Sequence, residues 1–369
     1  GSYFLEISGI QYVSEGGPAI YKIHLYSYLS IFIFLLHVLQ TGFKKIAVNL
    51  KFFYKPWLLL LLSIVYLIVY GLFKFGTSGM AYVVDTLLVP VMLFPIMFIF
   101  NQKQYRNIAR FLFILLAINS FAAIFEYISG FQIFSFEYEE HWIYFRSTAF
   151  LSHPLNNALI VSFLAIFLFK YRFINPVMLF LLTSLALFCF GARTATFIFI
   201  CLSLFELVTI YVVQYRRKRG FGFNEFLLLK IVIMGSVFVL FYAIFYLNFG
   251  QRIFENLSMD NSARSRFDVF NVFQYLSFDE YLFGARPEFF DNIIFYIDNF
   301  VVENFVIGWF LFYGIVGSSL LILTFYKFMF SIFSVSQRPE RVAILAFLIT
   351  SISNNSLAIT HFSKKIIST

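Results

Sequence analysis

Apolar residues occur in long runs along the chain, and short polar segments separate these runs. A helix needs roughly 20 mostly apolar residues to cross the hydrocarbon core of a bilayer. On this criterion the pattern predicts about ten spanning helices, at residues 20–40, 56–73, 81–100, 107–129, 153–171, 175–190, 194–214, 226–247, 304–333 and 342–360. The predicted fold class is therefore all-α, with residues 1–369 forming a single polytopic membrane domain.

The overall composition leads to the same class. Of the 369 residues, 61% are hydrophobic, 22% are aromatic and 12% are charged, whereas soluble domains carry about 25% charged residues. This balance excludes a disordered chain, a disulfide-rich secreted module and a nucleic-acid binder, in spite of the net charge of +8. Cys189 and Cys201 lie in apolar runs without metal-ligand spacing, so we expect buried thiols there, no metal and no cofactor.

The basic residues indicate how the predicted helices are oriented. They gather in five clusters, at residues 44–55, 103–110, 170–172, 216–219 and 338–341. With ten alternating spans, all five clusters fall on one side of the membrane. The positive-inside rule makes this side cytoplasmic.

The opposite, outer face keeps a small set of cations after this assignment. Between Phe75 and Ser363 all of them are arginines: Arg146, Arg193, Arg252, Arg264, Arg266 and Arg286. A guanidinium group grips phosphate through two parallel hydrogen bonds and stays protonated at any relevant pH. The set is what binding of a lipid-linked pyrophosphate requires; the alternative is pairing with the outward Asp and Glu residues.

Arg193 is the sharpest case, because it lies between two apolar helices at the outer membrane boundary, in the corner formed by residues 190–195. A charge at such a boundary is costly unless it is paired, and it indicates function by default. Asp85, near the start of the third predicted helix, is a plausible counter-ion for Arg193 and a weaker catalytic candidate.

A second outward segment, residues 146–158, opens the fifth predicted helix. Pro154 suits the first turn of a helix, because its missing N–H has no partner there in any case. His153 and Asn156 then share one face and are candidates to line a polar cavity. The alternative for His153 is a hydrogen-bonded structural residue.

The longest connection, residues 249–302, is predicted to form a large external loop. Long connections of this kind usually carry function. Ser262 is placed to cap a helix that Arg264 and Arg266 begin and that lies on the membrane surface. Its phenylalanines repeat at near-helical spacing, at Phe267, Phe270 and Phe273.

The end of this loop has its own pattern. Residues 282–287 predict a turn, and the chain re-enters the bilayer at Glu303 and Asn304. The small residues that follow, Gly308, Gly314 and Gly317, favour close packing of helices.

Four stretches, in this order, resemble the superfamily of O-antigen polymerases (Wzy-type) and O-antigen ligases. Residues 145–156 are similar to the family's R-S-G-x-F-x-H-P-N motif at a helix start, and residues 191–195 to its S-R-T-A corner, with Ala192 replacing the usual Ser. Residues 266–285 resemble the R…P-x-x-G-x-G part of the large loop. Glu303 and Asn304 stand where the ligases place His-Asn. Together the stretches extend from residue 145 to about residue 320.

The resemblance implies a GT-C-like polymerase or ligase architecture and an inverting, metal-independent glycosyl transfer on the outer leaflet. The donor would be a glycan on a polyprenyl pyrophosphate, and fixed cations would stabilise the negative charge of the departing pyrophosphate. By carry-over, Arg193 and Arg266 hold that group. Further candidates are Arg264, Arg146 and Arg286 for the pyrophosphate, and Asn156 and Asn304 as other polar residues of the cavity.

A general base must also accept the proton of the acceptor hydroxyl. The ligases use a loop histidine, but residues 249–302 contain none. Glu303 occupies that place and serves as the base if desolvation raises its pKa, with helix capping or an ion pair as the alternative. His153 is the other candidate base. This departure from the ligase pattern favours a polymerase.

The implied location is the bacterial inner membrane, with the active site facing the periplasm or the cell exterior. The implied partners are undecaprenyl-pyrophosphate-linked oligosaccharide, membrane lipid, and a chain-length regulator and flippase. The alternatives are an O-antigen ligase that transfers glycan to lipid A core, a flippase or transporter of lipid-linked sugars, and a structural membrane subunit.

Overall fold

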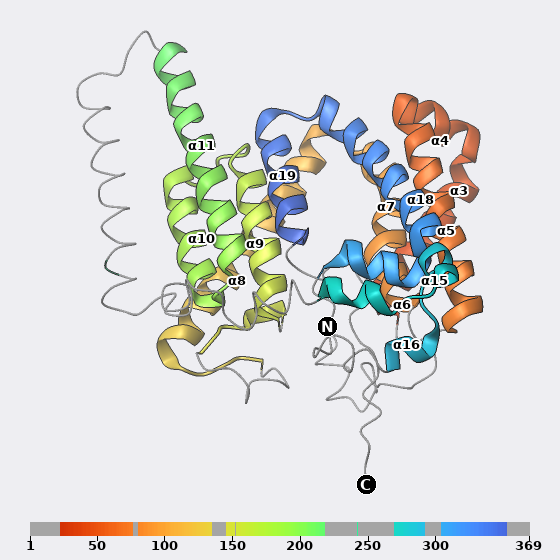
Figure 1. Ribbon diagram of the computed structural model, residues 1–369. Coiled ribbons are helices and arrows are strands. Elements are labelled where there is room, and N and C mark those ends of the chain that lie inside the picture. Colours follow the sequence, from red (N-terminus) through yellow and green to blue (C-terminus); the bar gives the residue numbers. More distant parts are fainter. Residues whose placement is uncertain are drawn as a thin grey trace. The chain divides into compact units, whose positions relative to one another are not determined.

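The computed structural model describes residues 23–76, 80–134, 145–151, 153–217, 242, 269–291 and 304–352. Every secondary-structure element in these ranges is a helix (Figure 1). The chain divides into two compact units. Unit 1 holds the described elements up to Phe100 and those between Asn261 and Val335, and unit 2 holds those between Asn101 and Asp260 together with the helix that follows Ser336.

Unit 1 begins with α3 (Leu25–Thr41), α4 (Phe43–Leu50), the 3₁₀-helix η1 (Lys51–Phe53) and α5 (Tyr54–Phe75). Next come α6 (Met80–Val83), the π-helical turn η2 (Val84–Leu88) and α7 (Val89–Phe98), which follow one another without a break. The later elements are the 3₁₀-helix η5 (Val269–Tyr275), α15 (Phe278–Phe283), α16 (Pro287–Asp291) and α18 (Phe305–Val335). Helix α3 packs against α7, and both α5 and α15 pack against α18.

Helix α18 is broken at Gly314, where φ is 65° and ψ is −174°. Only glycine adopts this backbone region readily. A Cβ at Gly314 would lie 2.2 Å from the carbonyl oxygen of Leu282, and one at Gly284 would lie 2.3 Å from that of Phe312. The two glycines therefore let the end of α15 dock directly on the backbone of a broken membrane helix, and the N–H of Ala285 donates to the carbonyl of Leu311 at 2.7 Å.

The described part of unit 2 is a helical bundle built around α9 (Pro154–Leu168). This helix contacts α8 (Gln102–Ser129), α10 (Pro176–Phe190), α11 (Arg193–Arg217) and α19 (Arg338–Ile352), and the short 3₁₀-helix η4 (Ala149–Leu151) precedes it. Local signals set the boundaries. Asn101 caps α8, Pro154 and Pro176 occupy the first turns of α9 and α10, and Gly191 ends α10 in the left-handed conformation.

The all-α prediction is confirmed, and the predicted apolar segments coincide with helices wherever the structure describes them. Five described helical runs are long and apolar enough to cross a membrane: Phe43–Phe75, Met80–Phe98, Gln102–Ser129, Arg193–Ile210 and Phe305–Val335. Three other apolar helices are shorter: Leu25–Thr41, Pro154–Leu168 and Pro176–Phe190. The described residues thus do not reach the expected number of about ten full-length spans. The segment 226–247 lies outside the described residues.

The short helices have a local cause. Helices α9 and α10 contain 15 residues each, which corresponds to a length of about 22 Å. Proline begins both of them, and Gly191 ends α10 before the apolar run is long enough to match a hydrocarbon core of about 30 Å. The predicted segments 153–171 and 175–190 begin and end within three residues of these helices.

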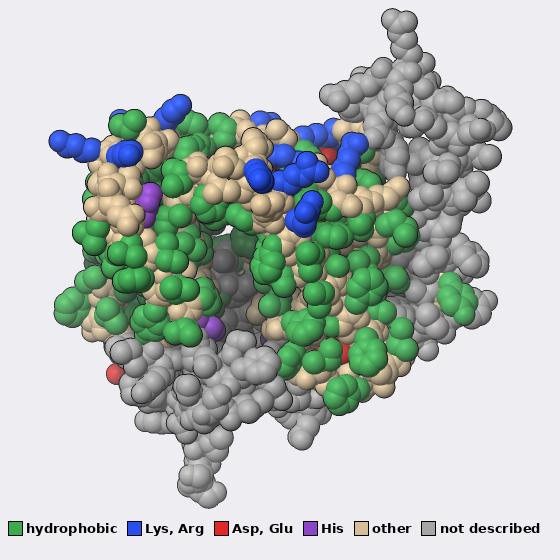
Figure 2. Space-filling view, turned by 180° about the vertical axis from the view of Figure 1, so that it is seen from behind, with side chains coloured by type: hydrophobic (Ala, Val, Ile, Leu, Met, Phe, Trp, Pro, Cys, Tyr) green, Lys and Arg blue, Asp and Glu red, His purple; other side chains and the backbone are tan. Residues whose placement is uncertain are grey.

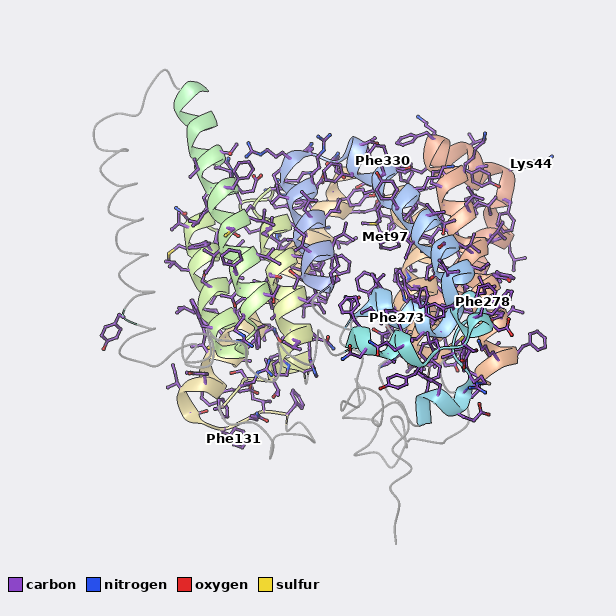
Figure 3. All side chains as sticks on the ribbon, in the orientation of Figure 1. Lys44, Met97, Phe131, Phe273, Phe278 and Phe330 are labelled. Atoms are coloured by element: carbon purple, nitrogen blue, oxygen red, sulfur yellow. The ribbon has the colours of Figure 1, made fainter. Side chains whose placement is uncertain are left out.

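Each unit presents the surface of a membrane-embedded protein. Figure 2 shows apolar side chains over the sides of the helices, and in each unit the visible Lys and Arg side chains gather at one end. In unit 1 the phenylalanines Phe278 and Phe330 are 76% and 59% exposed and project from the surface (Figure 3). In unit 2, Lys170 pairs with Glu340 at 2.7 Å, and Arg338 pairs with Glu206 at 3.0 Å.

Candidate functional site

Two of the predicted motifs meet in unit 2. Nε of Arg146 donates to the carbonyl of Phe190 at 3.0 Å, and the N–H of Ser147 donates to the carbonyl of Cys189 at 3.1 Å. Both carbonyls belong to the last turn of α10, directly before the Gly191 turn that leads to Arg193. The segment 145–151 and the corner 190–193 therefore form one structural element, at the opposite end of α9 from Lys170.

The two arginines of this element have different surroundings. Arg146 is buried, with 7% of its surface exposed, whereas Arg193 is half-buried and is the first residue of α11. The first N–H groups of a helix have no partner within the helix and stabilise a negative charge. The guanidinium group of Arg193 and the N-terminus of α11 can therefore both stabilise an anion bound at the start of this helix.

Glu126 organises the segment around Arg146, and the sequence patterns did not single it out. Its carboxylate is fully buried and accepts hydrogen bonds from the N–H groups of Ile133 at 2.7 Å, Thr148 at 2.8 Å and Ala149 at 2.9 Å. Ala149 has a positive φ of 41°, so this carboxylate holds a backbone conformation that alanine rarely adopts. The available signal was a lone acid within the apolar run that forms α8.

We expect Glu126→Ala to destabilise the protein strongly, because the substitution leaves three backbone donors without their acceptor. Each unsatisfied buried donor costs about 1–3 kcal/mol. Thermal unfolding of the purified protein in detergent measures the effect. The control is Asp279→Ala, which removes an exposed carboxylate; equal melting temperatures for the two variants would contradict the role of Glu126.

Neighbouring asparagines extend this network into α9. Nδ2 of Asn157 donates to the carbonyls of Thr148 at 2.6 Å and His153 at 3.1 Å, and Asn119 donates to Oδ1 of Asn157 at 2.9 Å. His153 is the residue before α9 and is half-buried, as is Asn156. The predicted residues His153 and Asn156 thus lie at the start of α9, next to the same element, and the buried Asn157 that fixes their position was missed.

Asp85 lies in unit 1, within the π-helical turn η2, and its carboxylate has partners in that unit. Nδ1 of His24 lies 2.5 Å from Oδ2, and Oγ of Ser27 donates to Oδ1 at 2.6 Å. The carboxylate is buried and the His24 side chain is 48% exposed. The sequence patterns missed this pairing of Asp85 with His24. The role of Asp85 as the counter-ion of Arg193 stays a prediction.

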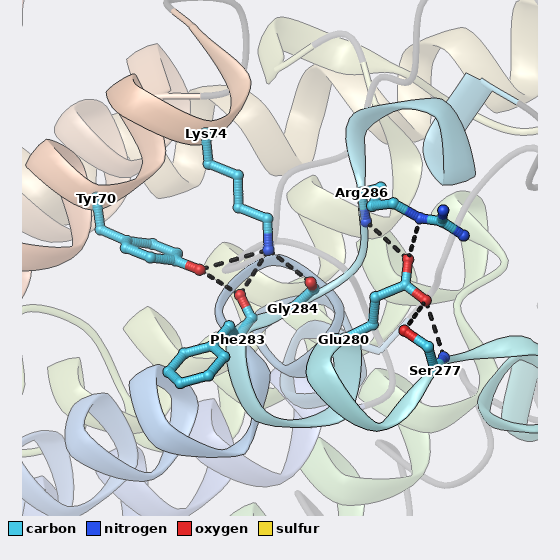
Figure 4. Close-up of polar contacts among 7 residues, drawn as sticks. All are labelled: Tyr70, Lys74, Ser277, Glu280, Phe283, Gly284 and Arg286. Carbon is cyan, nitrogen blue, oxygen red and sulfur yellow. Dashed lines mark hydrogen bonds and ion pairs between the residues drawn. The ribbon is translucent and has the colours of Figure 1, made fainter.

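Arg286 is held in unit 1 by Glu280, as Figure 4 shows. Oε1 of Glu280 accepts hydrogen bonds from the backbone N–H of Arg286 at 3.2 Å and from its Nε at 2.8 Å. Oε2 accepts hydrogen bonds from the N–H and Oγ of Ser277, both at 2.8 Å. Glu280 is buried, while the Arg286 side chain is 73% exposed. The carboxylate thus fixes Nε and leaves the outer edge of the guanidinium facing outward.

The hydrogen bonds change the acidity of Glu280. Burial alone raises the pKa of this carboxyl, but the four hydrogen bonds from Ser277 and Arg286 outweigh it and lower the pKa to about 2. The ordinary pKa of Glu is about 4.3. Because the folded value is the lower one, these contacts add stability that is fully present above the ordinary pKa and is lost as the pH falls towards 2.

We therefore expect wild type and Glu280→Gln to differ in melting temperature by a constant amount from pH 7 to pH 5. The difference should shrink as the pH falls from 4 to 2, because the wild-type carboxylate then becomes protonated. Thermal unfolding across this pH range measures it. A difference that stays constant down to pH 2 would contradict the lowered pKa.

Lys74 secures the same turn and was also missed. Its Nζ donates to the carbonyls of Phe283 at 2.6 Å and Gly284 at 2.5 Å, and Tyr70 donates from its hydroxyl to the carbonyl of Phe283 (Figure 4). A lysine at the last carbonyls of a helix stabilises its C-terminus, and here that helix is α15. The set of outward cations was drawn from residues after Phe75, one position beyond Lys74 in the sequence.

The remaining predicted residues divide into two groups. Glu303, Arg252, Arg264, Arg266 and Ser262 lie outside the described residues. Asn304 is described, and its side chain caps α18 by accepting hydrogen bonds from the N–H groups of Val306 at 2.9 Å and Ile307 at 3.3 Å. Phe270 and Phe273 lie in the 3₁₀-helix η5 rather than in an α-helix, and a spacing of three is the period of a 3₁₀-helix.

Within the described residues, no group of three or more His, Cys, Asp or Glu side chains is arranged to hold a metal ion. Cys189 is buried as expected, but Cys201 is exposed, because it lies on the outer face of α11. No family model, curated protein or solved structure matches the chain. Each unit therefore carries a candidate of its own: an arginine at a helix N-terminus in unit 2, and an exposed arginine in unit 1.

Proposed function

We propose that the protein is a polysaccharide polymerase of the Wzy type, which joins oligosaccharide repeat units carried on polyprenyl pyrophosphate. The observation that carries this proposal is the packing of the Arg146 segment against the corner that presents Arg193. These are two of the four stretches that carry the resemblance. Arg146 and Phe190, which the hydrogen bond joins, are 44 residues apart in the sequence. Because the two motifs pack together at one end of the bundle in unit 2, both are placed to act at the same site.

In the proposed reaction, Arg193 binds the pyrophosphate of the donor. Arg146 holds the corner at residues 190–193 in place through its hydrogen bond to the carbonyl of Phe190. Arg264, Arg266 and Arg286 are the further candidates for binding pyrophosphate that the resemblance implies. As the bond between the sugar and the pyrophosphate breaks, negative charge develops on the leaving oxygen, and fixed guanidinium groups stabilise that charge. The ion pair with Glu280 supports this role for Arg286, because it holds the side chain in one orientation.

An observation in unit 1 also favours the second candidate, a transporter of lipid-linked sugars. Interrupted helices commonly form transporter binding sites, and α18 is broken at Gly314. The end of α15, however, packs against the break at Gly314, and the N–H of Ala285 donates to the carbonyl of Leu311, three residues before the break. This packing favours a fixed contact between the loop and α18 rather than a pathway through which a substrate moves. The polymerase is therefore the preferred proposal.

The test is a reconstitution of the purified full chain in liposomes with lipid-linked oligosaccharide extracted from cells of the producing strain. A polymerase converts this substrate into a ladder of longer glycans on polyprenyl pyrophosphate. Transfer only to added lipid A core would instead indicate a ligase, and movement between leaflets without new glycosidic bonds would indicate a flippase. Either result would contradict the proposal.

A further inference from the structure

The pair formed by His24 and Asp85 has the geometry of a proton-accepting dyad. Asp85 lies in η2, and His24 is the residue that precedes α3; the distance from Nδ1 of His24 to Oδ2 of Asp85 is 2.5 Å. An aspartate that accepts the Nδ1 proton leaves the lone pair of a neutral imidazole on Nε2. The His24 side chain is 48% exposed, whereas that of Asp85 is 6% exposed. The buried carboxylate of Asp85 therefore orients the imidazole of His24, which is accessible from outside.

The carboxylate of Asp85 is fixed from several directions. Ser27 donates to Oδ1 at 2.6 Å, and the backbone N–H of His24 lies 3.3 Å from each carboxylate oxygen. These groups belong to the N-terminus of α3, which stabilises a negative charge. The ring of Tyr26 lies 5.4 Å from that of His24 and limits its movement. The π-helical turn that carries Asp85 is a rare conformation that occurs frequently at functional sites.

The topology of unit 1 places this dyad at the same end of the unit as the turn that holds Arg286. Helix α3 runs from His24 towards α4, which carries Lys44 and Lys45. Helix α5 then returns and carries Lys74 in its last turn, next to the turn that holds Arg286. By the positive-inside rule the lysine-rich α4 is cytoplasmic, so His24 lies at the opposite, extracytoplasmic end of this unit.

We propose that His24 is the general base that activates the acceptor hydroxyl and that Asp85 is its positioning residue; this inference rests on the polymerase function proposed above. The acceptor O–H proton moves to Nε2 of His24 while the acceptor oxygen bonds to the anomeric carbon. The bond from that carbon to the pyrophosphate oxygen breaks, and its electron pair leaves with the pyrophosphate. The imidazolium then releases its proton to water. This assignment replaces Glu303 and His153 as the base.

The first experiment separates a base from a residue that only caps α3. In His24→Asn the side-chain amide still donates to Asp85, but the basic nitrogen is lost. A general base contributes roughly 10²–10⁴-fold to rate, so kcat in the liposome assay should fall by about that factor, with an unchanged KM for the lipid-linked donor. Asp85→Asn should lower kcat in the same way, and Asp85→Glu should restore part of it.

The matched control is His37→Asn, on the same helix, where Nδ1 of the histidine lies 3.4 Å from Oγ1 of Thr41; this variant should retain wild-type rates. In His24→Ala, added imidazoles should restore activity in proportion to their basicity, which a purely structural role does not predict. A His24→Asn variant within a few-fold of wild type, alongside an inactive Glu303→Gln variant, would overturn the assignment.

A second experiment does not depend on turnover, so it separates this inference from the proposed function. Diethyl pyrocarbonate acylates the neutral nitrogen of accessible imidazoles, and mass spectrometry locates the product. His24 should react faster than His37, and Asp85→Asn should slow the reaction at His24 several-fold. This result would establish the dyad even if the wild-type chain made no polymer. An unreactive His24, or one indifferent to Asp85→Asn, would overturn the dyad itself.

Discussion

Arg193→Ala is expected to abolish polymer formation while leaving the amount of folded protein in the membrane unchanged. The guanidinium of Arg193 stands at the N-terminus of α11, and its removal takes away both the charge and the paired donors that receive the departing pyrophosphate in the proposed reaction. The loss of one fixed donor to a developing oxyanion typically lowers kcat by about 10²–10³-fold. The ladder of products from lipid-linked oligosaccharide in liposomes gives the measurement.

Two further variants make this result specific. Arg193→Lys keeps the charge but not the planar donor fork, so it should recover only a small part of the activity. Arg110→Ala removes an exposed arginine of α8 in the cationic end of unit 2 and should leave the product ladder unchanged. Wild-type chain length and yield from Arg193→Ala would show that the pyrophosphate is bound elsewhere.

Gly314→Ala is expected to destabilise the protein strongly. A side chain there meets two obstacles, a backbone region that only glycine adopts readily and the carbonyl of Leu282 at 2.2 Å from the new Cβ. The backbone strain costs about 1–3 kcal/mol, and the steric overlap pushes α15 off α18. We expect a total destabilisation of about 3–5 kcal/mol and a large drop in the melting temperature.

Gly76→Ala is the matched control, because it separates the two contributions. Gly76 has φ of 68° and ψ of −155°, close to the values at Gly314, and a Cβ there would have no heavy atom within 4 Å. The control should show the backbone strain alone. If both variants lose the same stability, the docking of α15 on α18 does not contribute to the fold.

The helices were predictable because their signals are local. Runs of apolar residues predicted α5, α8, α10 and α18, and Pro154 predicted where α9 begins. The break in α18 was not predicted. Gly314 was assigned to helix packing, because its role depends on the carbonyl of Leu282, which approaches it only in the folded chain.

In the candidate site, too, local features were predicted from the sequence and contacts between distant residues were not. The sequence analysis placed Arg146 and Arg193 in one set of six outward arginines, but it did not predict that a hydrogen bond to the Phe190 carbonyl joins their segments. The sequence analysis missed Glu126, His24 and Lys74, because each of them contacts a partner elsewhere in the chain. A single residue of this kind also produces no periodic pattern in the sequence. A general signal would have been a single charged or titratable residue near the end of an apolar run, since such a residue needs a partner.

The most direct test of the account is a structure of the full chain with a bound polyprenyl pyrophosphate, determined by electron cryo-microscopy in lipid. We predict density for the diphosphate within hydrogen-bonding distance of the guanidinium of Arg193 at the start of α11. Weaker density, or none, is predicted with Arg193→Ala. A diphosphate bound among the basic residues of α4, or a pyrophosphate position unaffected by Arg193→Ala, would contradict the claim that outward arginines receive the leaving group.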